Sequence, residues 1–202
     1  MTMNRVFYIF RHGETDWNRE RRCQGHTNVQ LNATGIEQAA NLAMKMSDFP
    51  MDIIISSDLA RAHNTGKLVA EKKGIPIVID PRLREMSYGE AEGLLYNEAI
   101  NLYGEDLWLR FQTFNRANDQ ISFPGGETRF EARDRFHKAL MEIIETTNHK
   151  FIGISTHGGA LRNILHSFLP ENHSLLTIPN CVVYKCEYIH NENRFKVDPN
   201  PI

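Results

Sequence analysis

A short apolar run at residues 6–10 ends directly in Arg11-His12-Gly13. Five apolar residues are too few to cross a membrane, so the run predicts a buried strand. A cation at the end of a buried strand costs free energy unless an anion meets it, and the planar guanidinium group of arginine suits phosphate or carboxylate. Histidine can act there as a nucleophile or carry a proton near neutral pH. The opening of the chain therefore predicts an anion site at a strand end.

Buried runs that read as strands alternate along the chain with stretches whose apolar residues recur at helical spacing. This alternation is typical of an α/β domain, and we expect a three-layer α/β/α sandwich with a mostly parallel central sheet and helices on both faces. Thr34 with Glu37, and Thr128 with Glu131, have the spacing of helix capping boxes. The expected strands are residues 6–10, 52–55, 75–79, 151–155, 180–188 and 194–197, and the expected helices are residues 35–47 and those beginning near Leu59, Thr128 and His157.

Charged and titratable side chains follow several of these buried runs. Arg11 with His12, Arg61 and His157 come after three different runs. Because ligands of parallel α/β sheets bind outside the carboxyl ends of the strands, we expect these side chains to meet at one edge of the sheet. Arg61 falls in the first turn of its helix, where free N–H groups already favour anions. Two arginines and two histidines call for an anionic ligand, and a phosphoryl group offers the matching charge and acceptors.

The opening motif Arg11-His12-Gly13-Glu14-Thr15-x-Trp17-Asn18 resembles the signature of the histidine phosphatase superfamily, the phosphoglycerate-mutase-like enzymes. This resemblance implies the phosphoglycerate mutase-like fold and one histidine phosphatase domain over residues 1–202. It also implies a lid-like segment at about residues 88–126 that selects the substrate. Further matches follow in order along nearly the whole chain: Gln24-Gly25, Leu31, Gly35, Gln38-Ala39, Ser57 to Ala62, Leu83-x-Glu85, Gly89-x-x-Glu92-Gly93 and Thr156-His157-Gly158.

The resemblance implies a metal-independent phosphomonoesterase. His12 would attack phosphorus in line and form a phosphohistidine, while Arg11, Arg61 and His157 hold the equatorial oxygens. Glu85 matches the acid/base position of the family, so it would protonate the leaving oxygen and then deprotonate the hydrolytic water. These five residues are the expected catalytic set.

The resemblance further implies how substrate and nucleophile are held. The backbone carbonyl of Gly13 would orient the ring of His12. No metal or cofactor is required, and no cluster of acidic and histidine residues has metal-ligand spacing. Substrate contacts are expected from Asn18, Gln24, Gly25, Tyr88 and Gly158.

Two alternatives stay open beside the phosphatase. A cofactor-dependent phosphoglycerate mutase is the first, but such enzymes are typically longer and carry Asn where this chain has Gly159, and both departures favour the phosphatase. A phosphate-binding regulatory module without turnover is the second, and the presence of all five catalytic positions argues against it. Short chains of this pattern resemble broad-specificity, α-ribazole-phosphate and fructose-2,6-bisphosphatase-like phosphatases equally.

Composition limits the partners. A formal net charge of -2 gives no reason to expect nucleic acid or an anionic membrane, so the expected partner is a phosphorylated small molecule, with a homodimer left open. Cys23, Cys181 and Cys186 lack paired spacing, and no apolar signal segment opens the chain, which fits the cytoplasm. Arg21 and Arg22 could neutralise a second substrate anion, but a solvated loop is the favoured interpretation.

Overall fold

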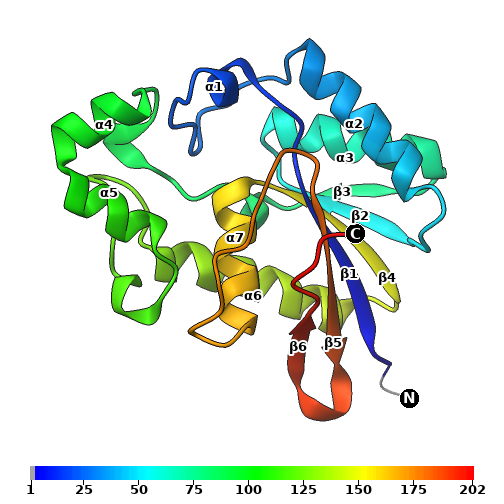
Figure 1. Ribbon diagram of the computed structural model, residues 1–202. Helices are drawn as coiled ribbons and strands as arrows, with labels where there is room; N and C mark the ends of the chain where they lie inside the picture. Colours follow the sequence, from blue (N-terminus) through cyan, green and yellow to red (C-terminus); the bar gives the residue numbers. More distant parts are fainter. Residues whose placement is uncertain (1–2) are drawn as a thin grey trace.

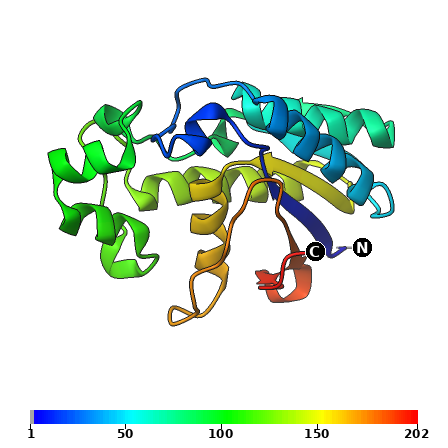
Figure 2. The same cartoon turned by 45° about the horizontal axis from the view of Figure 1, so that its top comes forward.

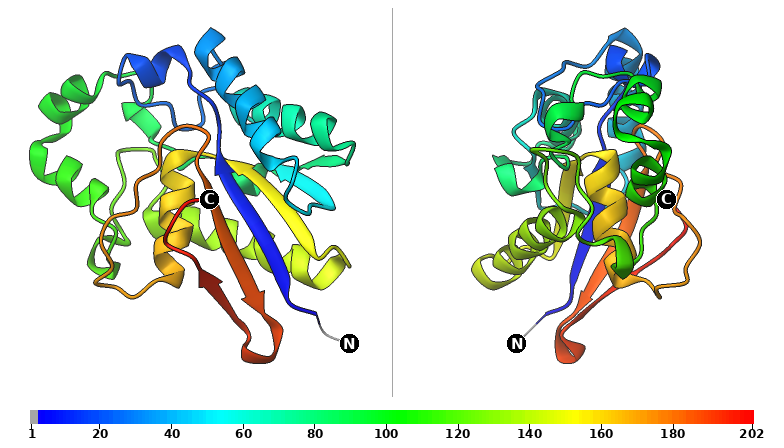
Figure 3. Two further views of the ribbon diagram at one scale, coloured as in Figure 1. Left: turned by 45° about the vertical axis from the view of Figure 1, so that its right-hand side comes forward. Right: turned by 90° about the vertical axis from the view of Figure 1, so that its left-hand side faces the viewer.

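A computed structural model describes residues 3–202, so the first two residues of the expected domain lie outside the described part. Its strands are β1 (Arg5–Arg11), β2 (Ile53–Ser56), β3 (Ile77–Ile79), β4 (Phe151–Thr156), β5 (Val183–Ile189) and β6 (Arg194–Val197). They form one sheet in the order β3-β2-β4-β1-β5-β6 (Figure 1). In this order β3, β2, β4 and β1 are parallel to one another, and β5 runs antiparallel to β1 (Figure 3). The expected α/β class with a mostly parallel sheet is confirmed.

Helices cover both faces of the sheet. One layer holds α2 (Ala33–Met46) and α3 (Ala60–Lys73), and the opposite layer holds α6 (Arg129–Thr146) and α7 (Gly158–Phe168) (Figures 1 and 2). The remaining α-helices of the described residues are α1 (Asp16–Arg19), α4 (Tyr96–Tyr103) and α5 (Glu105–Gln112). In residues 3–202, no helix has the length and apolar character that crossing a membrane requires.

The central strand β1 explains why two helical layers are needed. Its side chains alternate between the two faces, so Phe7 and Ile9 pack in the core shared with α6 and α7. Tyr8 and Phe10 pack in the core shared with α2 and α3. A strand that is apolar on both faces is stable only when both are covered, as the uninterrupted apolar run predicts.

The start of α2 differs from the expected capping box. Asn32 is the N-cap, and its side-chain oxygen accepts a hydrogen bond of 2.8 Å from the backbone N–H of Gly35, so the Thr34–Glu37 box is wrong. The reason is tertiary: the backbone of Gly35 packs so tightly on the 13–14 loop that an added Cβ would lie 2.0 Å from the carbonyl oxygen of Glu14. The second expected box, Thr128 with Glu131, is confirmed at the start of α6.

Two of the expected strands are shorter in the structure than the sequence predicts, and each has a local reason. The strand expected over 75–79 is short and lies at the sheet edge as β3, consistent with Pro76. The strand expected from residue 180 begins only at Val183, because Cys181 adopts a left-handed conformation with φ of 56°. The chain turns there around the carbonyl oxygen of His12, which accepts from Cys181 N at 3.3 Å and Asn180 Nδ2 at 3.0 Å. All three cysteines are unpaired.

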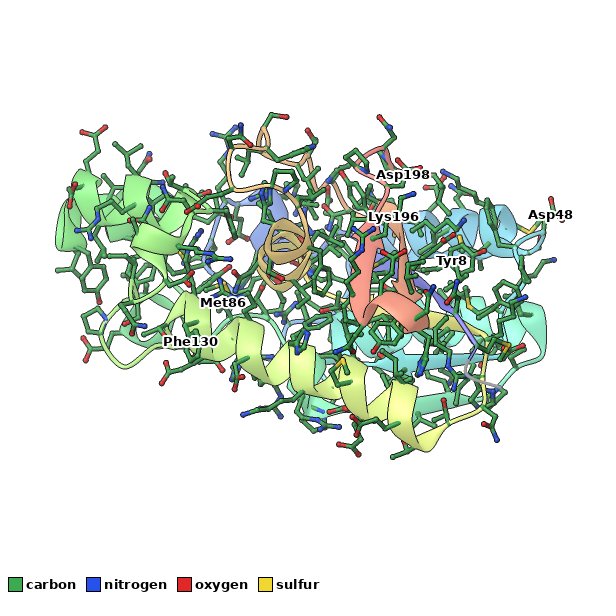
Figure 4. All side chains as sticks on the ribbon, turned by 90° about the horizontal axis from the view of Figure 1, so that it is seen from below. Tyr8, Asp48, Met86, Phe130, Lys196 and Asp198 are labelled. Atoms are coloured by element: carbon green, nitrogen blue, oxygen red, sulfur yellow. The ribbon has the colours of Figure 1, made fainter. Side chains whose placement is uncertain are left out.

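The segment expected to act as a lid carries α4 and α5, which stand beyond the end of the sheet (Figure 2). Gly104 separates the two helices with φ of 89°. The segment has a small aromatic core that includes Phe111, Phe123 and Trp108. Met86 joins this core from the polypeptide entering the segment (Figure 4). That the segment moves as a lid stays a prediction.

Candidate active site

The carboxyl ends of β1, β2 and β4 lie next to one another. Arg11 pairs with Thr156 at the end of the β1–β4 ladder, and the backbone N–H of His12 donates to the carbonyl oxygen of Thr156 at 3.0 Å. His12 and His157 are therefore each the first residue beyond a strand. Their ring centroids lie 5.2 Å apart, with an interplanar angle of 61°. The topology thus brings the two histidines together as the strand order predicts.

A cavity of about 200 Å³ opens at this edge. It is lined by the sequence-predicted residues Arg11, His12, Asn18, Gln24, Arg61, Glu85, Tyr88 and Gly158. His157 lies behind the lining, against His12. Gly25 does not line the cavity either. Its carbonyl oxygen instead accepts a 2.7 Å hydrogen bond from Arg61 Nη2, so Gly25 supports an arginine of the site.

His12 is held in one tautomer by its neighbour. Its Nδ1 lies 2.6 Å from the carbonyl oxygen of Gly13, which can only accept, so Nδ1 carries the proton. Burial and the charges of Arg61 and Arg11 hold the pKa of His12 well below its ordinary value. The imidazole is therefore neutral near pH 7, and Nε2 keeps its lone pair. A buried neutral imidazole with a free Nε2 is suited to attack an electrophile.

His157 is the second fixed imidazole. Its Nε2 lies 2.8 Å from Ser57 Oγ, while its Nδ1 is buried without a partner among the described residues. Burial, followed by the nearby charge of Arg61, holds the pKa of His157 well below its ordinary value. A buried polar atom without a partner costs free energy in the free protein.

Arg61 is a buried cation and Arg11 a half-buried one, and the partners of both are only backbone carbonyls. Arg11 Nη1 donates to Ile178 O at 2.7 Å, and Arg61 Nη1 donates to Thr27 O at 2.8 Å. Within residues 3–202 neither forms an ion pair, and the Nε atom of each is buried without a hydrogen bond. Burial lowers the pKa of Arg61 to about 10, so it stays charged at neutral pH. Unpaired buried guanidinium groups favour an anionic ligand.

Glu85 lies between these cations and the start of α7. Its Oε1 accepts hydrogen bonds from Met86 N at 2.9 Å and Ala160 N at 2.6 Å, and its Oε2 accepts one from Gly159 N at 2.9 Å. The missing side chain of Gly159 makes this approach possible, since an added Cβ would lie 2.8 Å from Glu85 Oε1 and 2.9 Å from Tyr88 Oη. The carboxylate is therefore fixed in the cavity by backbone donors.

A further layer fixes the backbone of Glu85. Its carbonyl oxygen accepts from Arg135 Nη2 at 2.6 Å and from His26 Nε2 at 2.8 Å. Arg135 also forms an ion pair of 2.7 Å with Glu127. The carboxylate in the cavity is thus positioned from α6 as well as from α7. Nothing in the local sequence around Glu85 indicates this support from α6.

Several lining residues escaped the sequence analysis. Arg162 lies four residues after Gly158 on α7, and this spacing places both on one helix face, which is a signal that could have found it. Arg22, interpreted as part of a solvated loop, also lines the cavity, and its Nη1 donates to Gly93 O at 2.6 Å. The other lining residues that were missed are Met86, Tyr96, Phe111, Gln112, Phe114, Gly159 and Ile178.

The chemistry of the lining is that of an anion site with one fixed carboxylate. Across the part of the chain that the structure describes, no group of three or more His, Cys, Asp or Glu side chains is placed to hold a metal ion. The lining combines the guanidinium groups of Arg11 and Arg61 and the imidazole of His12 with aromatic rings, among them those of Tyr96 and Phe111 from the α4–α5 segment. The arrangement can hold an oxyanion against His12 with Glu85 beside it.

The buried neutral histidines make stability pH-dependent. His12 and His157 bind protons in the unfolded chain near pH 6.5 but not in the folded protein, so acidification favours the unfolded state. We expect the free energy of unfolding to fall below pH 6.5 by up to about 1.4 kcal/mol per pH unit for each of the two. Urea unfolding at pH 7.5, 6.5 and 5.5 measures this. His157→Gln should flatten the dependence and His190→Gln should not. Equal slopes in all three proteins would contradict the assignment.

Comparisons with known proteins identify the family of this chain. Residues 7–198 match the model of the histidine phosphatase superfamily, branch 1. The chain is 34% identical over 157 residues to the uncharacterized phosphatase PhoE of Bacillus subtilis, covering 78% of this chain and 74% of the relative. It is 34% identical over 184 residues to the probable phosphoglycerate mutase GpmB of Escherichia fergusonii, covering 90% and 84%. A mycobacterial glucosyl-3-phosphoglycerate phosphatase superimposes with a TM-score of 0.85 at 24% identity, covering 96% of this chain and 97% of that one, and so shares the fold.

Proposed function

The chain belongs to branch 1 of the histidine phosphatase superfamily, and from that premise we propose that it is a metal-independent phosphomonoesterase acting through a phosphohistidine on His12. The observation that carries the proposal is the state of His12. It is neutral, its Nδ1 proton is committed to Gly13, and its free Nε2 lies in a cavity with two arginines that form no ion pair, the buried Arg61 and the half-buried Arg11. A phosphoryl group satisfies those arginines and presents an electrophilic phosphorus to Nε2.

In the first step, the lone pair on His12 Nε2 attacks phosphorus and the ester P–O bond breaks. The leaving oxygen takes a proton from Glu85, which can receive that proton from a monoanionic phosphomonoester when the substrate binds. The Nε atoms of Arg11 and Arg61 and the Nδ1 of His157 lack partners in the free protein and are suited to the phosphoryl oxygens. These contacts strengthen as charge redistributes on the phosphoryl group.

In the second step, water attacks the phosphohistidine while Glu85 takes one of its protons. The P–N bond breaks, its electron pair returns to His12 Nε2, and inorganic phosphate leaves. The same carboxylate thus serves as acid and then as base, which requires that it stay fixed between the two steps. Its backbone donors at the start of α7 support that role.

The size of the cavity supports a small substrate. Its volume of about 200 Å³ lies below the range of roughly 300–1,000 Å³ usual for sites that enclose drug-sized ligands. We therefore propose a phosphorylated metabolite of few atoms rather than a nucleotide. We assign the enzyme to the cytoplasm, since its three cysteines are unpaired and two of them are buried.

The alternative function is that of a phosphoglycerate mutase, which the name of one relative suggests. A mutase must keep its phosphohistidine long enough to return the phosphoryl group to a substrate. Against it stands the contact at Gly159, where any side chain would press on the carboxylate of Glu85 and on Tyr88. The resemblance places an asparagine at this position in cofactor-dependent mutases. We take the fixed carboxylate as favouring transfer to water.

The test is phosphate release from a panel of phosphorylated metabolites in the presence of a metal chelator. The panel holds sugar phosphates, 3-phosphoglycerate, nucleotides and α-ribazole phosphate, and we expect release from the smaller members. A parallel assay follows conversion of 3-phosphoglycerate to its 2-isomer. Conversion without release would favour the mutase. Tight binding of inorganic phosphate without either activity would favour the binding module.

A further inference from the structure

Arg129, the first residue of α6, is a buried arginine that the proposed reaction does not use. It is only 1% exposed, and among the described residues it forms no ion pair. Burial lowers the pKa of its guanidinium group to about 10, so the group stays charged at neutral pH. A buried charge without a carboxylate partner costs free energy, and the dipole of α6 disfavours a cation at the N-terminal end of that helix. The stability of α6 therefore does not explain this arginine.

The partners of Arg129 lie at the end of α5. Its Nη2 donates to Phe111 O and its Nη1 to Thr113 O, both at 2.6 Å. The last carbonyl groups of a helix lack partners within it, and a cation is favoured at that end. The Cζ atom of Arg129 also lies 3.6 Å from the ring centroid of Phe114, in a cation–π contact. Arg129 thus fixes residues 111–114 through two backbone carbonyls and one aromatic ring.

The residues that Arg129 holds form part of the catalytic cavity. Phe111, Gln112 and Phe114 line that cavity, whereas Arg129 does not. Phe114 also lines a neighbouring cavity of about 400 Å³, and Arg129 lines this second cavity as well. The ring of Phe114 therefore belongs to a wall between the two cavities, and its displacement would widen the catalytic cavity.

Few other contacts determine where α5 lies. Among the helices and strands, α5 packs chiefly against α4, and both stand beyond the end of the sheet (Figure 2). Arg129 is itself held by the sandwich, because its carbonyl oxygen accepts a 2.8 Å hydrogen bond from Nδ2 of Asn163, a buried residue of α7. The backbone N–H groups of Gly159 and Ala160 on the same helix bind Glu85. One helix therefore holds the carboxylate directly and the aromatic wall through Asn163 and Arg129.

We propose that Arg129 is a positioning residue that fixes the cavity wall at residues 111–114 and thereby sets the affinity for the organic part of the substrate. This inference rests on the proposed phosphatase function and adds the residue that controls the fit beyond the phosphoryl group. Arg129 acts through Phe111 and Phe114, so its loss should weaken binding of the organic part and leave the chemistry at His12 intact. Inorganic phosphate has no organic part and should bind as it does to the wild type.

The test compares Arg129→Met with the wild type on p-nitrophenyl phosphate, whose aryl ring is the organic part. Methionine keeps an unbranched side chain but removes the charge and the donors. Because ordering two side chains on ligand binding costs affinity, we expect KM to rise about 5- to 100-fold. Both kcat and the inhibition constant of inorganic phosphate should change by less than about threefold. Arg129→Lys should give an intermediate KM, because an ammonium group can donate to a carbonyl but lacks the planar fork.

Arg116→Met is the matched control. It removes an exposed arginine that also lines the second cavity but not the catalytic one, so KM should stay at the wild-type value. An unchanged KM in a folded Arg129→Met protein would overturn the proposal, as would a phosphate inhibition constant that rises as much as KM. If Arg129→Met does not fold, Arg129→Lys replaces it. A KM at least about threefold above wild type would then support the proposal, and an unchanged KM would overturn it.

Amide hydrogen exchange of the free protein tests the anchor without any substrate. We expect the amides of residues 105–114 to exchange at least about tenfold faster in Arg129→Met, while those of β1 and β4 keep wild-type rates. Equal exchange over residues 105–114 in both proteins would contradict the positioning role. Faster exchange in β1 and β4 as well would mean general destabilisation and would also contradict it. If the wild type releases phosphate from no compound, the phosphatase proposal fails, and this comparison still decides whether Arg129 fixes the wall.

Discussion

Replacing His12 with alanine is expected to lower kcat/KM for any phosphomonoester by about 10⁴-fold or more, because no other side chain can form the covalent intermediate. His157 is the nearest imidazole, but its Nε2 is engaged with Ser57 and the ring lies behind the cavity lining. The remaining arginines would still bind phosphate. The loss should therefore appear in kcat, with KM or the dissociation constant of inorganic phosphate changed far less.

The measurement is steady-state phosphate release together with trapping of labelled protein from a ³²P-labelled substrate after an alkaline quench, which preserves phosphohistidine. Wild type should carry label on His12. His190→Ala changes a histidine on the β5–β6 turn and should behave as wild type. Label on another residue, or a loss below tenfold in a folded His12→Ala protein, would contradict the nucleophile assignment. Thermal unfolding monitored by circular dichroism verifies the fold, since His12 is buried.

The main elements of the site could be predicted because parallel topology leaves little freedom. A residue that follows a buried strand must leave the sheet at its carboxyl edge, so the strand runs before Arg11, His12 and His157 determined their common location. Arg61 followed from its place in the first turn of α3. In each case one backbone element decides where the side chain goes.

Features that depend on contacts between distant segments could not be predicted in this way. The N-cap of α2 is set by the approach of Gly35 to Glu14, and the late start of β5 by the turn of Cys181 around His12. Gly25 appears in a motif that suggests ligand contact, yet it holds Arg61 through its carbonyl. To predict that Arg162 lines the cavity, one must know how α7 is oriented relative to the cavity. Sequence spacing alone does not encode these approaches.

Replacing Glu85 with glutamine is expected to have the second-largest effect, and the loss should depend on the leaving group. For alkyl phosphates, whose leaving oxygen needs a proton, kcat/KM should fall by about 10²- to 10⁴-fold. For p-nitrophenyl phosphate, whose leaving group departs without one, formation of the phosphohistidine should be slowed far less. Hydrolysis of the intermediate still needs a base. The variant should therefore release one equivalent of nitrophenolate in a burst and then stall.

Stopped-flow detection of nitrophenolate measures that burst directly. Glu90→Gln is the matched control, because Glu90 lies nearby in sequence but is exposed and outside the cavity lining. Glutamine at 85 keeps one acceptor oxygen, but its amide N–H groups would face the donor of Gly159 or Ala160, so unfolding must be measured alongside. Equal losses for alkyl and aryl substrates, with no burst, would mean that Glu85 orders the start of α7 without transferring a proton. A burst with accumulated phosphohistidine would assign to Glu85 both the protonation of the leaving oxygen and the deprotonation of water. In that case the variant would still form the phosphohistidine from an aryl substrate, which needs no acid, but would not hydrolyse it.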